Sequence, residues 1–152
     1  MRVLEHVKDL LRPHNGCALR LTDNDIGVIA PYNKQVQKLK RLFKAEGLDN
    51  VKVGSTEMFQ GQEKKVIIIT SVRSSEDWVG SDVRHNLGFL DNPKRFNVAV
   101  TRACSLMIII GNPAVLAPDP HWGKLLRMCI ERGAYRGVAP PPADAGGGGP
   151  DD

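Results

Sequence analysis

Three short runs of apolar residues set the strongest limit on how this chain can fold. They occupy positions 26–30, 66–72 and 105–110 and read IGVIA, VIIITSV and SLMIII. Each run is apolar at consecutive positions rather than at alternate ones, which is typical of a parallel strand covered on both faces. All three are far shorter than the roughly 20 apolar residues that a membrane-spanning helix needs. They therefore predict buried strands of a folded domain.

Amphipathic segments separate these runs and have the apolar spacing of helices. They cover residues 2–11, 33–47, 93–103 and 120–133, and a brief strand, VKVGS, lies at 51–55. The order predicts an α/β fold in which helices cover both faces of a parallel sheet. From residue 138 the chain reads VAPPPADAGGGGPDD, which cannot form a core. We expect one domain over 1–137 and a disordered tail over 138–152.

Charge and cysteine content restrict the class of protein only loosely. The formal charge of +4 favours an anionic partner such as nucleic acid or a nucleotide, although many basic faces are merely solvated. Cys17, Cys104 and Cys129 are widely spaced and form no C-x-x-C pair, which favours a reducing compartment and predicts no metal site. We expect a cytoplasmic protein with no membrane partner.

Ligands of open α/β sheets bind at the carboxyl ends of the strands, so the residues there are the first candidates for a site. Pro31 and Tyr32 follow the first apolar run. Ser55 and Thr56 follow the short strand VKVGS, and the turn FQGQE comes next. We expect these residues to share one edge of the sheet.

The QGQE turn is a candidate phosphate site. Gly61 lies between Gln60 and Gln62, where the backbone can approach a ligand closely or take a positive φ angle. Exposed N–H groups in such a turn can hold a phosphate, and Glu63 can accept from a ribose hydroxyl. An ordinary tight turn explains the same residues equally simply, and spacing alone favours that explanation.

The segment RFNVAVTRA poses a question about charge. If it is helical through Ala103, Arg95 and Arg102 share one stripe of the helix, about 10 Å apart along its axis. Two guanidinium groups so placed need an anion or a carboxylate beside them. A surface salt bridge would suffice, and a polyphosphate would match the guanidinium geometry better. The residues alone do not choose between the two.

Three strings in order and spacing carry a family resemblance. GVIAPY, VGSTEMFQGQEKKVIIITSVR and RFNVAVTRA followed by IIIGNP resemble motifs IV, V and VI of superfamily 1 helicases of the up-frameshift-like group. The resemblance covers residues 26–137, and NLGFLDNPKRFNVAVTRA looks closest to the Armitage-like RNA helicases of small-RNA silencing. It implies the second of two RecA-like domains, which together clamp ATP and Mg²⁺ and carry single-stranded RNA across their top.

The resemblance also assigns roles to individual residues. It implies that Arg102 is the arginine finger on the γ-phosphate, and that Gln60, Gly61 and Glu63 contact the nucleotide. It implies that Arg95 and Asn97 support the motif VI helix. The residues that it places along the RNA backbone are Pro31, Tyr32, Ser55 and Thr56.

Two features depart from a complete helicase. The chain has no G-x-x-x-x-G-K-[ST] phosphate loop and no acidic strand for Mg²⁺, so we expect the N-terminal RecA-like domain to supply both. Relatives carry an arginine shortly after the motif IV PY, where this chain offers Lys34 as a point charge toward the nucleotide.

We therefore expect the C-terminal ATPase half of an RNA helicase in RNA silencing or RNA decay, inactive alone, with silencing proteins as further partners. A non-enzymatic module that binds RNA or a protein is the alternative hypothesis. An unrelated nucleotide-binding α/β protein is a third, but the chain lacks a glycine-rich fingerprint.

Overall fold

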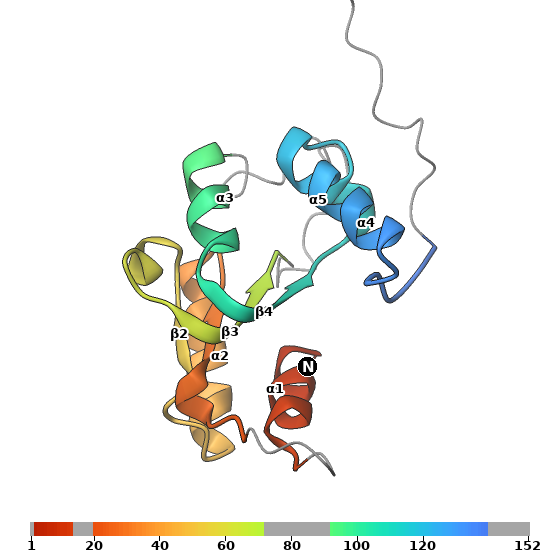
Figure 1. Ribbon diagram of the computed structural model, residues 1–152. Helices are drawn as coiled ribbons and strands as arrows, with labels where there is room; N and C mark the ends of the chain where they lie inside the picture. Colours follow the sequence, from red (N-terminus) through yellow and green to blue (C-terminus); the bar gives the residue numbers. More distant parts are fainter. Residues whose placement is uncertain (1, 14–19, 72–91, 140–152) are drawn as a thin grey trace, which may run out of the picture.

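The computed structural model describes residues 2–13, 20–71 and 92–139 (Figure 1). Its elements are α1 (Arg2–Leu11), η1 (Asp23–Asp25), β1 (Ile26–Ile29), α2 (Asn33–Ala45), β2 (Lys52–Gly54), η2 (Glu57–Phe59), β3 (Lys64–Thr70), α3 (Pro93–Val100), β4 (Ala103–Ile110), α4 (Pro113–Leu116) and α5 (Pro120–Glu131). Each helix and strand predicted from the sequence is present. Most of the predicted tail, 140–152, lies outside the described residues.

The four strands form one parallel sheet in the order β2-β1-β3-β4. Val66 of β3 pairs with Ile26 on one side and with Leu106 on the other, so the three strands run in close register. In a parallel sheet all amino ends lie along one edge and all carboxyl ends along the opposite edge. The predicted α/β class is confirmed, and the architecture is that of a RecA-like domain.

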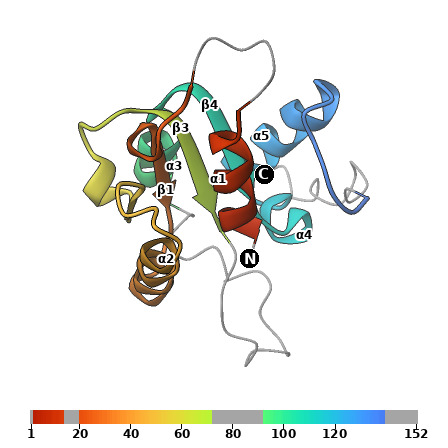
Figure 2. The same cartoon turned by 90° about the horizontal axis from the view of Figure 1, so that it is seen from below.

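Helices cover both faces of the sheet (Figures 1 and 2). On one face α1 and α2 pack against alternate strand residues; this core includes Val7, Leu39, Phe43, Val28 and Ile68. On the other face η2, α3, α4 and α5 pack against the intervening residues; this core includes Phe59, Ala99, Leu116, Trp122, Ile67 and Ile69. The consecutive apolar positions of β3 reflect this two-sided burial, because Ile67, Ile68 and Ile69 are all fully buried.

The prediction of two-sided burial is wrong for β4. Within the described part of the chain β4 pairs with β3 alone, and it therefore lies at an edge of the sheet. Its residues are exposed or half-buried, and the side chain of Leu106 is 43% exposed. An apolar run alone cannot distinguish a central strand from an apolar edge strand, since both have the same sequence pattern.

The helix that precedes β4 is shorter than predicted. It begins at Pro93, behind an Asn92 side chain that accepts a hydrogen bond from Lys94 N, and it ends at Val100. Thr101 caps its end, and Ala103 already belongs to β4. Arg102 therefore lies in the connection between helix and strand rather than on the helix, so it shares no helical stripe with Arg95.

The connection from β2 to β3 contains a core residue that the sequence pattern did not single out. Phe59 is fully buried, although most of the residues around it in the sequence are polar. Its ring lies against β1 at Gly27, where a Cβ atom would be only 2.6 Å from Phe59 Cε1. Glycine at 27 therefore makes room for the ring, and the ring fixes η2 on the sheet.

We expect Phe59→Ala to lower the free energy of unfolding by about 3–5 kcal/mol, because it empties a closed site in the core. Met58, its neighbour in η2, is 47% exposed, so Met58→Ala should cost less than about 1 kcal/mol. Urea denaturation followed by circular dichroism measures both values. Equal losses in the two variants would contradict the placement of Phe59 in the core.

Candidate active site

The structure divides the predicted site residues between the two edges of the sheet. Pro31, Tyr32, Ser55 and Thr56 lie at the carboxyl ends of β1 and β2, as expected. The turn at 60–63 directly precedes β3, and Arg102 directly precedes β4, so both lie at the amino edge. The two edges are roughly 20 Å apart along the seven residues of β3. The expectation that the QGQE turn shares the carboxyl edge is wrong, because η2 carries the chain back across the sheet.

Backbone pairing brings the turn and the arginine together at the amino edge. Lys64 N donates to Arg102 O at 3.1 Å, which joins the first residue of β3 to the residue before β4. Cys104 Sγ donates to Glu63 Oε2 at 3.7 Å across the same pair of strands. Gly61 has a φ of +72°, and the space where a Cβ would stand is open. The backbone of the turn is thus accessible to a ligand that approaches this edge.

Arg102 is half-buried, and its guanidinium is only partly satisfied. Its Nη2 donates to Thr101 Oγ1 at 3.0 Å. Its Nε is buried, and no acceptor reaches it from the described residues, which also provide no carboxylate in an ion pair with it. A guanidinium has five N–H donors in a planar fork that matches phosphate oxygens. Because Nε is buried, a phosphate would meet the terminal nitrogens, and the absence of a carboxylate partner among the described residues is the observation that best fits an anionic ligand at this edge.

Arg95 differs from Arg102 in having a carboxylate partner. Arg95 Nε donates to Glu57 Oε1 at 2.8 Å, which joins α3 to η2. Partial burial opposes ionisation of Glu57, but hydrogen bonds from its own backbone N–H and from Ser55 and Arg95 outweigh it, so the pKa of this carboxyl is lowered. The surface salt bridge therefore accounts for Arg95 and leaves Arg102 unexplained.

Aromatic packing holds the other side of α3. Phe96 meets Trp122 of α5 edge to face, with ring centroids 4.9 Å apart. Trp122 is fully buried. Asn97, a predicted supporting residue, is exposed, and its carbonyl accepts from Thr101 Oγ1 at 2.7 Å. The helix that leads to Arg102 is thus held by the ion pair of Arg95, by contacts of the Phe96 ring with Trp122 and His121, and by hydrogen bonds at its end.

The carboxyl edge contains residues with different degrees of access. Tyr32 and Ser55 are half-buried, whereas Pro31 and Thr56 are buried. Thr56 Oγ1 donates to Glu57 Oε2 at 3.3 Å, so this hydroxyl supports the ion pair of Glu57 and does not face outward. That Thr56 lies along the RNA backbone stays a prediction, and its buried side chain leaves the backbone of this segment as the part to be tested.

Lys34 lies apart from the other residues predicted to contact the nucleotide. It is exposed in the first turn of α2, which follows the carboxyl end of β1. Arg102 and Glu63 lie at the opposite edge. The placement of Lys34 therefore does not support its prediction as a second γ-phosphate contact.

Gln35 is a buried polar residue at the carboxyl edge that the sequence analysis missed. It is 4% exposed, and its Nε2 donates to Thr70 Oγ1 at 3.1 Å. Its Oε1 is buried, and no donor among the described residues reaches it. Its position one helical turn before Leu39 and two before Phe43 was a usable signal, because a polar residue on the apolar side of a helix needs a buried partner.

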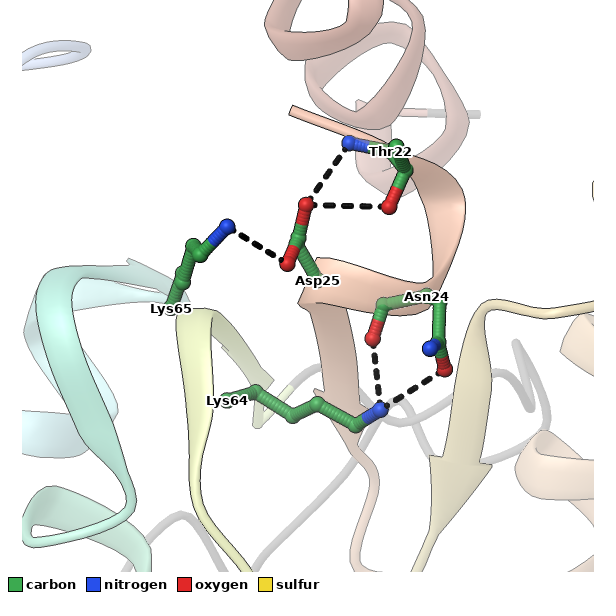
Figure 3. A network of polar contacts seen from close by, with 5 residues as sticks. All are labelled: Thr22, Asn24, Asp25, Lys64 and Lys65. Atoms are coloured by element: carbon green, nitrogen blue, oxygen red, sulfur yellow. Dashed lines mark hydrogen bonds and ion pairs between the residues drawn. The ribbon is translucent and has the colours of Figure 1, made fainter. Parts of the chain in front are cut away.

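A polar network fixes the amino ends of β1 and β3 (Figure 3). Asp25 Oδ2 accepts from both N and Oγ1 of Thr22 at 2.9 Å, and Lys65 Nζ lies 2.9 Å from Asp25 Oδ1. Lys64 Nζ donates to Asn24 O at 2.5 Å. The hydrogen bond from Thr22 N, followed by those from Lys65 and the Thr22 hydroxyl, lowers the pKa of Asp25 to about 2. Both lysines thus have partners on the side of η1.

The low pKa of Asp25 predicts how stability depends on pH. Its carboxylate is favoured in the folded state, so the stabilisation is complete above the ordinary value of 3.8 and is lost as pH falls toward about 2. We expect the midpoint of urea unfolding to decrease between about pH 4 and pH 2, and this decrease to be smaller in Asp25→Asn. Asp9→Asn, at an exposed surface pair, is the matched control and should keep the wild-type slope. A wild-type slope in Asp25→Asn would contradict the assignment.

Two negative findings apply to 2–13, 20–71 and 92–139. No group of three or more His, Cys, Asp or Glu side chains there could hold a metal ion, so these residues do not fit Mg²⁺ and no chemical step is assigned to it here. No helix in these segments combines the length and the apolar character needed to cross a bilayer.

Comparison with known proteins identifies the family of the chain. A family model described as an AAA domain matches residues 1–114. The chain is 49% identical over 146 residues to the putative helicase mov-10-B.2 of zebrafish (Danio rerio). It is 53% identical over 123 residues to the mouse RNA helicase Mov10l1 and 47% identical over 117 residues to the probable RNA helicase armi of Drosophila melanogaster.

The chain belongs to the superfamily 1 helicases of the up-frameshift-like group. Within this group it lies close to the Armitage-like members. These matches cover 90%, 81% and 77% of the chain, respectively. The chain spans 14% of the length of the zebrafish relative and 10% of the length of each of the other two. It thus corresponds to a small part of each helicase.

Proposed function

We propose that this chain is the C-terminal RecA-like half of an ATP-dependent RNA helicase, and that its amino edge supplies the arginine finger Arg102. The observation that carries the proposal is the half-buried guanidinium of Arg102, which has no carboxylate partner among the described residues and whose backbone pairs with Lys64, next to the Gly61–Glu63 turn. Membership of the helicase family and the names of its relatives support the same conclusion.

Arg102 would stabilise the charge that develops on the γ-phosphoryl group of ATP as water attacks its phosphorus and ADP leaves. Such a transition state is stabilised chiefly by positioned charge, and an arginine finger contributes about 10³- to 10⁵-fold in rate. The rigid sheet below it reduces the freedom of the guanidinium before the reaction, which is the condition for such stabilisation. The open backbone at Gly61 and the carboxylate of Glu63 would hold the phosphate and ribose side of the nucleotide.

The carboxyl edge would face single-stranded RNA through Tyr32, Ser55 and the backbone at Pro31. RNA binding at the carboxyl edge can be coupled to nucleotide binding at the amino edge, because η2 and α3 connect the two edges and the Glu57–Arg95 ion pair joins these elements. We extend the proposal to a cytoplasmic role in RNA silencing, on the strength of the likeness to armi and Mov10l1.

A chimaeric helicase tests the proposed role of Arg102. The matching segment of zebrafish mov-10-B.2 is replaced by this chain, and RNA-stimulated ATP hydrolysis is measured. We expect Arg102→Ala to lower kcat by about 10³-fold or more, and Arg102→Lys to restore little, because lysine lacks the guanidinium fork. Arg127→Ala, at an exposed arginine of α5, is the matched control and should keep kcat.

A fully active Arg102→Ala chimaera would overturn the finger assignment and favour a domain that binds RNA or protein without taking part in catalysis. The isolated chain provides a second check, since we expect it to hydrolyse no ATP. Appreciable hydrolysis by the isolated chain would contradict its dependence on a partner domain.

A further inference from the structure

A groove runs along the outer margin of the sheet at β2. It has a volume of about 420 Å³ and lies between α2 and η2, with β2 along its floor. Both α2 and η2 contact β2, and the three elements lie at the same end of the sheet (Figures 1 and 2). Its lining combines lysine side chains with apolar ones: Lys40, Lys44, Lys52, Leu48, Val53 and Met58.

The groove has an excess of positive charge. Three lysines line it, and Asp49 is its one acidic residue. Within the described part of the chain neither Lys40 nor Lys44 forms an ion pair, and Lys52 Nζ donates to the neutral side chain of Gln62. Burial, followed by the charges of Lys64 and Lys40, lowers the pKa of Lys52. An anionic group in the groove would relieve this repulsion.

The floor of the groove is an open strand edge. Gly54 O accepts from Ala30 N, and the parallel register turns the backbone groups of Lys52 and Gly54 toward β1. The N–H and C=O of Val53, which lies between them, therefore point outward. Among the described strands β2 pairs with β1 alone, so this donor and this acceptor have no strand partner. Val53 is only 3% exposed, so an extended segment reaches them by displacing the side chains that cover this edge.

Apolar side chains flank the open edge. Met58 is 47% exposed on the η2 side, and Leu48 is half-buried on the α2 side. Methionine adapts its shape to a partner, so it is common at protein-binding surfaces. Phe43 is the one aromatic residue of the lining and is 1% exposed, so it offers no surface on which a nucleic-acid base could stack. This combination fits a peptide better than single-stranded RNA.

We propose that this groove binds an acidic, extended peptide segment of a partner protein by strand addition to β2. In this mode main-chain hydrogen bonds to Val53 give affinity, and pockets for alternate side chains give selectivity. Acidic side chains of the peptide meet Lys40, Lys44 and Lys52, and apolar side chains contact Met58 and Leu48. The proposal does not rest on the ATP chemistry proposed for Arg102, although Lys52 also contacts Gln62 in the turn next to Arg102.

Fluorescence anisotropy of the whole chain tests the proposal. The probe is a short labelled peptide in which glutamate alternates with leucine or valine, and a labelled oligouridylate is the RNA probe. Lys40→Glu with Lys44→Glu should weaken peptide binding about tenfold or more, because it reverses two charges in the groove. Lys38→Glu with Arg41→Glu, at exposed positions of α2 outside the groove, is the control with the same change in net charge.

The proposal is supported if the Lys40→Glu, Lys44→Glu variant loses peptide affinity and the control double variant keeps it. It also requires that a peptide with glutamine in place of glutamate binds more weakly. It is overturned if the two double variants lose peptide affinity equally or if the wild-type chain does not bind the peptide. It is also overturned if the Lys40→Glu, Lys44→Glu variant binds RNA more weakly and still binds the peptide. Circular dichroism of each variant verifies that the helix and the sheet remain folded.

Discussion

The parallel pairing of β3 with β4 determines where the candidate catalytic groups lie. The hydrogen bond from Lys64 N to Arg102 O fixes the first residues of the two strands side by side. Glu63 and Arg102 are each one residue before their strand, so the pairing brings them to the same edge. β3 is buried on both faces, and rotation of this pair would disturb two hydrophobic cores at once. The apolar strands therefore hold the position of the cation.

The two arginines around α3 show how local structure separates similar residues. Arg95 is in the first turn of the helix and has Glu57 as its partner. Arg102 lies beyond the helix end, where Thr101 satisfies one nitrogen and leaves Nε unmatched within the described residues. An exposed ion pair contributes little to stability, but Glu57–Arg95 also joins the β2–β3 connection to the helix before β4. The main effect of this ion pair is to position the β2–β3 connection and α3 relative to each other, since both lead to the amino edge.

Sequence reasoning predicted the fold well where one residue pattern has one structural meaning. Consecutive apolar residues predicted the strands, helical spacing predicted the helices, and the three motifs led to the family. It failed where the meaning depends on neighbours in space. β4 has the composition of a central strand and lies at an edge, and Phe59 is a core residue in a polar segment. The QGQE turn follows β2 in sequence but reaches the amino edge, because the chain crosses the sheet through η2. Burial of Thr56 and Gln35 likewise depends on packing between elements that sequence spacing does not specify.

A nuclear magnetic resonance titration of the isolated chain tests most directly whether the sheet has two functional edges. Backbone amide shifts are recorded with ATP at millimolar concentration and, separately, with an oligouridylate. The account predicts that ATP shifts the amides of Gly61, Glu63 and Arg102, and that the oligouridylate shifts those of Tyr32 and Ser55. If ATP shifted Tyr32 and Ser55 and left the amides around Arg102 unchanged, the assignment of the nucleotide to the amino edge would be contradicted.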